Sequence, residues 1–199
     1  MNQNREYRTM EIRIQKSEEP EVKTYMVEGY ASTFEPYVLF RDGETEYKEQ
    51  IDPQAFDEAD LSDVVFRVDH EGKVYARSSA GSLEIWTDEH GLGNRADLSR
   101  TEAARALFEE IEAGNYPQMS FAFTVADDEY DKKTRTRLIR KVAKVFDVSP
   151  VAFPANPNTN LGVATRAYFD GVIEEEKAER LEAERREAQK QRIRILTEV

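Results

Sequence analysis

The sequence predicts a mainly β protein of the α+β class, an antiparallel β-barrel or sandwich with helices on its outside. Three observations lead to this fold class. Short segments with alternating apolar and polar residues recur along the first 150 residues, and a period of two is typical of strands buried on one face. One segment before residue 115 has the period of an amphipathic helix. A highly charged segment beginning at residue 171 predicts a solvated C-terminal helix.

The first strands are predicted over residues 7–16 and 22–33, where apolar side chains alternate with polar ones. A third, over residues 64–68, is rich in β-branched and aromatic residues. The segment 69–72, Asp-His-Glu-Gly, ends it with turn-forming chemistry. This places His70 at or just past the end of a strand.

A hairpin is predicted next, because residues 82–87 and 92–98 read as strands and a turn-forming segment separates them. A helix follows. Ser99 and Glu102 have the spacing of a capping box, and Gly114 suits the helix end. The apolar positions that share one face of this helix are Ala104, Leu107, Phe108 and Ile111.

The segment 115–125 alternates again. Its large side chains fall on one face, whereas Ser120 lies on the other, with Ala122 and Thr124. A charged turn is predicted over residues 127–136, and a further strand over 137–153. We therefore expect Ser120 on a strand face that carries only small side chains.

The 199 residues suit one folded unit with an appendage. We expect a domain over residues 7–165 and a helical tail over 171–199. The tail holds eight Glu and seven Lys and Arg, and pairs such as Glu182 and Arg186 stand four apart, which stabilises a solvated helix.

Composition argues against several classes of function. The formal charge of −12 disfavours nucleic acid and anionic membrane surfaces as direct partners. With no cysteine, the chain can form neither disulfides nor a thiolate zinc site. The N-terminal residues lack the apolar core of a signal peptide, and the uncharged segment 148–165 is too polar to span a bilayer. Neither a P-loop nor a GxGxxG pattern occurs, and no cofactor is expected.

A serine nucleophile needs a neighbouring base, and only His70 and His90 can supply an imidazole. A pKa near 6.5 lets histidine accept and return a proton near neutrality. Taken alone, Ser120 fits a solvent-facing strand serine and His70 an ordinary turn residue. His90 lies in the predicted hairpin turn, where a hydrated ring is the simpler interpretation.

Four ordered blocks add specificity: GYASTF (29–34), VDH (68–70), MSFAF (119–123) and DVSPVAFPANP (147–157). Together they resemble the prohead (capsid-maturation) serine proteases of tailed phages, over about residues 11–160. This family is distantly similar to the herpesvirus assemblins, which have a β-barrel flanked by helices. The resemblance therefore implies an assemblin-like antiparallel barrel.

The resemblance also implies roles for single residues. Ser120 matches the nucleophile and His70 the general base of the phage family. Asp147 stands where the family places an acidic residue, more often glutamate, and an anion there would orient the imidazole. Asp69 is the alternative orienting group. The donors that would stabilise the oxyanion stay open, with Arg77 and Arg166 as candidates.

By this resemblance the chain is a serine endopeptidase that processes the major capsid protein or its scaffold segment, and also itself. It would work inside the assembling procapsid, in the host cytoplasm, with the major capsid protein as partner and substrate. Assemblins act as dimers, so a homodimer is expected by analogy.

Two other classes of function stay open. A catalytically silent scaffolding or assembly protein would also explain the charged tail. A carboxylate-based or divalent-metal hydrolase can be written for any chain with 40 Asp and Glu, but no spacing singles out a pair.

Overall fold

The structure is a computed structural model that describes residues 5–13, 24–152 and 163–197. The chain divides into two compact units, Met1–Leu161 and Gly162–Val199. The described elements, in chain order, are β1 (Glu6–Arg13), β2 (Met26–Thr33), β3 (Tyr37–Asp42), β4 (Thr45–Ile51), β5 (Val65–Val68), β6 (Glu71–Arg77), the 3₁₀ turn η1 (Ser78–Ala80), β7 (Leu83–Thr87), β8 (Gly91–Asp97), α1 (Glu102–Glu112), β9 (Gln118–Asp131), β10 (Thr136–Val151) and α2 (Val163–Thr197).

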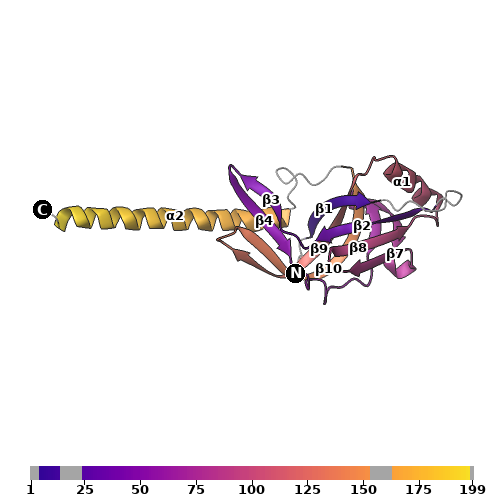
Figure 1. The fold of residues 1–199 in the computed structure, drawn as a ribbon, viewed down its shortest axis with the longest axis horizontal. Coiled ribbons are helices and arrows are strands. Elements are labelled where there is room, and N and C mark those ends of the chain that lie inside the picture. Colours follow the sequence, from indigo (N-terminus) through magenta and orange to yellow (C-terminus); the bar gives the residue numbers. More distant parts are fainter. Residues whose placement is uncertain (1–4, 14–23, 153–162, 198–199) are drawn as a thin grey trace. The chain divides into compact units, whose positions relative to one another are not determined.

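The first unit is built on strands, as predicted (Figure 1). Its strands follow the order β3-β4-β10-β9-β1-β2-β8-β7, with β5 joined to β10 and β6 joined to β5. The mainly β class with added helices is thus confirmed. The described strands do not close into a barrel, because β3 and β7 end the path. The predicted barrel is therefore not confirmed.

Strand β10 is the centre of the sheet, and it adds parallel pairings to the antiparallel arrangement that the sequence predicts. One edge of β10 pairs with β9 in antiparallel fashion. The other edge pairs in parallel with β4 near its start and with β5 near its end. A 16-residue strand is long enough to take two partners in succession, and register shifts between Ile139 and Asp147 mark where it changes course.

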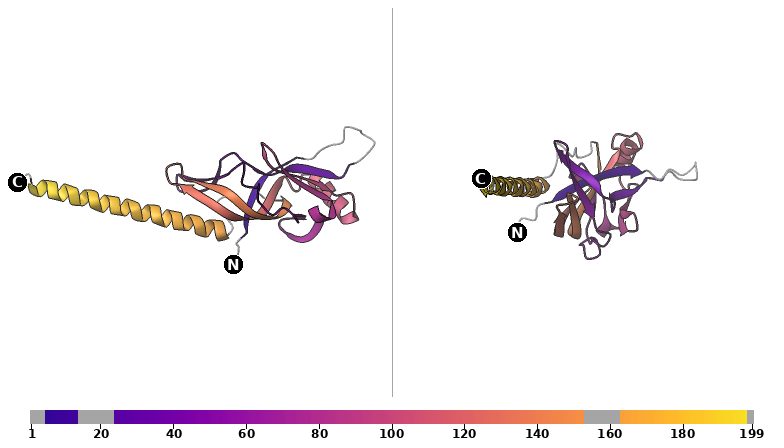
Figure 2. Two further views of the ribbon diagram at one scale, coloured as in Figure 1. Left: turned by 90° about the horizontal axis from the view of Figure 1, so that it is seen from below. Right: turned by 60° about the vertical axis from the view of Figure 1, so that its left-hand side comes forward.

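The β9–β10 hairpin is longer than the sequence predicts. A charged turn was expected over residues 127–136, but β9 continues to Asp131 and β10 resumes at Thr136. The charged residues stand at the end of this hairpin, where no side chain from Ala126 to Arg135 is buried. Figure 2 shows the twisted hairpin in its orange tones. Charge alone therefore predicted a turn where the backbone is still paired.

Helix α1 confirms the four buried positions expected for it, Ala104, Leu107, Phe108 and Ile111. Its N-cap was predicted wrongly as Ser99. The structure places Thr101 there, with its hydroxyl accepting a hydrogen bond from the backbone N–H of Ala104. Ser99 instead donates to Asp97 through both its backbone N–H and its hydroxyl.

Three strands were not predicted: β3 and β4, which form a hairpin, and β6, which returns along β5. The period-two alternation of apolar and polar residues is weak in β3 and β6, because charged side chains stand at exposed positions there. The hairpin of β7 and β8 is confirmed. Of the predicted strands 7–16, 22–33 and 137–153, residues 14–16, 22–23 and 153 lie outside the described part.

The second unit contains α2, which confirms the predicted charged C-terminal helix. The helix already begins at Val163, and the expected division into 7–165 and 171–199 stays a prediction. Most described side chains from Glu174 to Ile193 are exposed. Arg186 and Glu182 form an ion pair of 2.5 Å across one helical turn.

No helix in the described ranges has the length and apolar character needed to cross a membrane.

Candidate active site

Two neighbouring strands form the floor of the site. Ser120 lies on β9, where it pairs with Thr9 of β1 on one side and with Ser149 of β10 on the other. Residues directly opposite each other in a sheet project from the same face. Ser120 and Ser149 therefore share one face, and Asp147 joins them because it stands two residues before Ser149.

This face is buried, although its side chains are small. Ser120 and Asp147 are each 1% exposed, and Ser149 is fully buried. The large side chains of β9, such as Phe121 and Phe123, occupy the opposite face and belong to the main apolar core. The sequence correctly separated the two faces of β9, but Ser120 is not the solvent-facing serine that composition alone favoured.

His70 reaches this floor from the tight turn between β5 and β6. Val68 pairs with Glu71, so Asp69 and His70 are the two central residues of the hairpin turn. Both have positive φ, 47° for Asp69 and 61° for His70. Two successive positive φ values are the requirement of a type I′ turn, which favours Asn-Gly or Asp-Gly. A histidine here occupies a sparsely populated backbone region, a kind of strain that clusters at functional sites.

The turn is fixed to the end of β10 by several hydrogen bonds. The backbone N–H of Asp69 donates to the carbonyl of Pro150 over 3.2 Å, and its carboxylate accepts from the N–H of Ala152 over 3.2 Å. Nη1 of Arg67 donates to the carbonyl of His70 over 3.1 Å. These contacts offset the backbone strain and determine where the imidazole lies.

The three predicted residues form one hydrogen-bonded chain. Nε2 of His70 lies 2.7 Å from Oγ of Ser120, and Nδ1 lies 2.6 Å from Oδ1 of Asp147. An ionised carboxylate can only accept, so Nδ1 carries the proton in this network and Nε2 is left to accept from the serine hydroxyl. Such an arrangement can remove a proton from Ser120 and stabilise the imidazolium that forms.

Asp69, the alternative orienting group, does not point at the imidazole. Its carboxylate is occupied by the backbone of Ala152, although it precedes His70 in the chain. Positive φ at both residues turns the two side chains in different directions. The structure thus joins Asp147 to His70, and it uses Asp69 to fasten the turn.

The remaining predicted candidates lie elsewhere. The His90 ring is exposed and packs near Tyr30, with ring centroids 5.8 Å apart. The guanidinium of Arg77 is bound to Asp63 and Ser79, and the hydrogen bond and charge of Asp63 raise the pKa of Arg77. The side chain of Arg166 is not among those that the structure describes. No oxyanion donor is assigned among these residues.

Two residues of the site were missed from the sequence. Ser149 donates a hydrogen bond of 2.8 Å to Oδ1 of Asp147, and Arg67 holds the carbonyl of His70. Ser149 lies within the DVSPV block and two residues after Asp147, so strand periodicity could have identified it. No sequence signal identified Arg67, because its role depends on how the turn folds back.

Among the described residues, no group of three or more histidine and carboxylate side chains lies close enough together to hold a metal ion.

Comparison with known proteins points to one family. Residues 10–170 match the model of a family described as caudovirus prohead serine protease. The matched segment includes Ser120, His70 and Asp147. Searches of curated proteins and of solved structures give no match. The family match shows similarity to the phage proteases only. The similarity to herpesvirus assemblins stays a prediction.

Proposed function

Because this chain belongs to the caudovirus prohead serine protease family, we propose that it is the endopeptidase that processes the major capsid protein or its scaffold segment during prohead maturation. We further propose Ser120 as nucleophile, His70 as general base and Asp147 as the group that orients His70. The observation that carries this assignment is the continuous hydrogen-bonded chain from Asp147 through His70 to Ser120.

The reaction begins with Oγ of Ser120 attacking the scissile carbonyl carbon while Nε2 of His70 takes the hydroxyl proton. The negative charge of Asp147 stabilises the resulting imidazolium. When the tetrahedral intermediate collapses, the C–N bond breaks and His70 gives the proton to the departing amine. A water molecule then attacks the acyl ester, with His70 again acting as base, and Ser120 is regenerated.

The test is cleavage of the capsid-protein precursor by wild type, Ser120→Ala and His70→Ala. Loss of nucleophile or base removes the covalent route, so we expect kcat to fall by roughly 10⁴-fold or more. His90→Ala is the matched control, since its ring is exposed and outside the site. Unimpaired processing by Ser120→Ala or His70→Ala would refute the assignment.

A scaffolding protein without catalytic activity is the competing function, and the charged helix α2 is the feature that favours it. A serine-directed phosphonate separates the two. The protease assignment requires covalent labelling that maps to Ser120 and disappears in His70→Ala. A scaffolding protein would give no labelling, and its Ser120→Ala variant would still yield mature shells.

Self-processing and packaging form a separate part of the proposal. Helix α2 belongs to its own compact unit and has an exposed, charged surface, which suits a segment that guides incorporation into the prohead or is removed there. Deletion of residues 171–199 should reduce the amount of protease in proheads, measured by immunoblot. A deletion variant that is packaged and processed like wild type would contradict this role.

A further inference from the structure

Arg67 stands on the same face of the sheet as Ser120. Across β9 and β10, Ser120 is opposite Ser149. Across β10 and β5, the parallel pairs are Asp147 with Val65 and Val148 with Phe66, so the next position places Ser149 beside Arg67. Neighbouring strands are about 4.8 Å apart, and the backbone of Arg67 is therefore roughly 10 Å from that of Ser120.

The guanidinium of Arg67 has donors that the described structure does not use. Nη1 donates to the carbonyl of His70, whereas Nε is buried and has no hydrogen-bond partner among the described residues. No carboxylate pairs with Arg67 in the described part of the chain. Elsewhere in this unit arginines are paired with carboxylates, including Arg8, Arg77, Arg95 and Arg137. An unmatched buried donor in a chain of charge −12 calls for an explanation.

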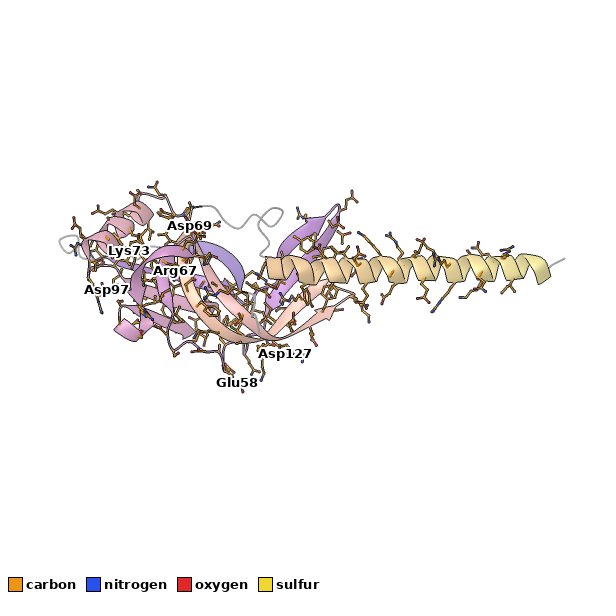
Figure 3. The ribbon with its side chains drawn as sticks, turned by 180° about the vertical axis from the view of Figure 1, so that it is seen from behind. Glu58, Arg67, Asp69, Lys73, Asp97 and Asp127 are labelled. Atoms are coloured by element: carbon orange, nitrogen blue, oxygen red, sulfur yellow. The ribbon has the colours of Figure 1, made fainter. Side chains whose placement is uncertain are left out.

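Part of the Arg67 side chain reaches solvent next to an exposed apolar side chain. Arg67 itself is half-buried, and its cross-strand partner on β6 is Val74. Val74 is 38% exposed, which is unusual for a large apolar side chain in this unit. Figure 3 shows Arg67 with Asp69 and Lys73 of the same hairpin, apart from Glu58 and Asp127. A cation beside an exposed apolar side chain fits a glutamate or aspartate whose aliphatic part rests on Val74.

We propose that Arg67 determines substrate specificity by binding an acidic side chain close to the scissile bond. This inference rests on the proposed protease function. The planar guanidinium matches a carboxylate in geometry and charge. An extended substrate advances about 3.3 Å per residue, and roughly 10 Å from Ser120 thus corresponds to a substrate residue within about three positions of the cleaved bond.

The experiment begins with a proteome-derived peptide library, in which cleavage sites are read by mass spectrometry. Wild type should enrich Asp and Glu at one position within about three residues of the cleaved bond. Two peptides that differ only by Glu or Gln at that position are then compared. A hydrogen bond to a charged group predicts that kcat/KM favours the Glu peptide by about 10- to 100-fold.

Arg67→Gln should bring this ratio close to one, Arg67→Lys should retain part of it, and Arg67→Glu should favour a Lys peptide. The ratio is the readout because loss of the Nη1 contact to His70 lowers the cleavage of both peptides alike. Lys73→Gln and Arg77→Gln remove the same charge from the same hairpin and are the matched controls. Both should keep the wild-type ratio.

Absence of acidic enrichment in wild type would overturn the proposal, as would an unchanged ratio in Arg67→Gln. An equal loss in Lys73→Gln would also overturn it, since the preference would then reflect the general charge of the hairpin. Failure of the protease assignment looks different. In that case wild type would cleave no peptide of the library, or Ser120→Ala would cleave it like wild type, whatever residue is preferred.

Discussion

The hydroxyl of Ser149 donates a hydrogen bond to the carboxylate oxygen of Asp147 that also faces the imidazole. The distances are 2.8 Å from Ser149 Oγ and 2.6 Å from His70 Nδ1 to the same Oδ1 atom. Ser149 is fully buried and lies directly opposite Ser120. The Asp147 carboxylate is thus held by the hydroxyl of Ser149 on its own strand and by the imidazole of His70 from the β5–β6 turn. These two contacts restrict its rotamer.

Ser149→Ala should lower kcat by about tenfold and leave KM unchanged, because the lost hydrogen bond supports a charged group that does not bind substrate. Steady-state cleavage of a peptide substrate measures both constants. Thr124→Val is the matched control, since this hydroxyl of β9 is buried without a partner among the described residues. Equal losses of kcat in the two variants would show that Ser149 acts only through packing.

Asp147→Asn should lower kcat by about 10³- to 10⁴-fold, because an amide no longer selects the imidazole tautomer that leaves Nε2 free to accept a proton. Single-turnover cleavage isolates this effect on chemistry. Asp69→Asn is the matched change at the alternative carboxylate. Asparagine tolerates positive φ and keeps an acceptor for Ala152, so its activity should stay within a few-fold of wild type. The opposite ranking of the two variants would make Asp69 the orienting group.

A buried ionic cluster joins β1, β4 and β10, and its disruption should destabilise the first unit. Arg137 and Arg8 bind Glu6 and Glu49, and all four residues are almost fully buried. Removing one partner leaves a buried charge uncompensated. Arg137→Met should therefore lower the free energy of unfolding by about 3–5 kcal/mol, measured by urea denaturation.

The control for this variant is Arg140→Met, three residues further along β10. Arg140 pairs with Glu129, and both side chains are about half exposed. An exposed pair contributes only about 0–1 kcal/mol. Similar losses in the two arginine variants would mean that burial of the cluster does not determine its contribution.

The same cluster predicts acid sensitivity. Burial alone would raise the pKa of Glu6, but the hydrogen bond from Arg137 and the charges of Arg8 and Arg137 outweigh it and lower this pKa below 4.5. A lowered folded-state pKa stabilises the fold above the unfolded value, and this contribution is lost as the pH falls through the folded value. Urea midpoints measured between pH 6 and pH 3 should fall below pH 4.5. Glu6→Gln should flatten this dependence.

The sequence predicted the local features of the fold better than its long-range ones. The β7–β8 hairpin and the buried face of α1 follow from residue patterns within a few turns of chain. The parallel contacts of β10 join residues that are far apart in the chain, such as Asp147 and Val65. No local pattern encodes them, and for this reason the predicted antiparallel arrangement misses the two parallel pairings of β10.

For the site, the resemblance to a family supplied the three candidate residues, while the structure supplied their relationship. The sequence left two carboxylates as partners of the imidazole, because a strand rule cannot be applied across a turn of unknown type. The positive φ of Asp69 and His70 resolves which carboxylate faces the ring. Asp-His is not a common pair for such a turn, and the turn type was therefore missed.

The two-residue turn means that the site residues come from two separate parts of the sheet. Ser120 and Asp147 belong to adjacent paired strands, whereas His70 is carried by the tip of a separate hairpin. A small displacement of that tip would disconnect the base from Ser120 and leave the sheet intact. The hydrogen-bonded chain from Asp147 to Ser120 therefore depends on the position of this turn. The hydrogen bonds of Asp69 and Arg67 hold the turn in that position.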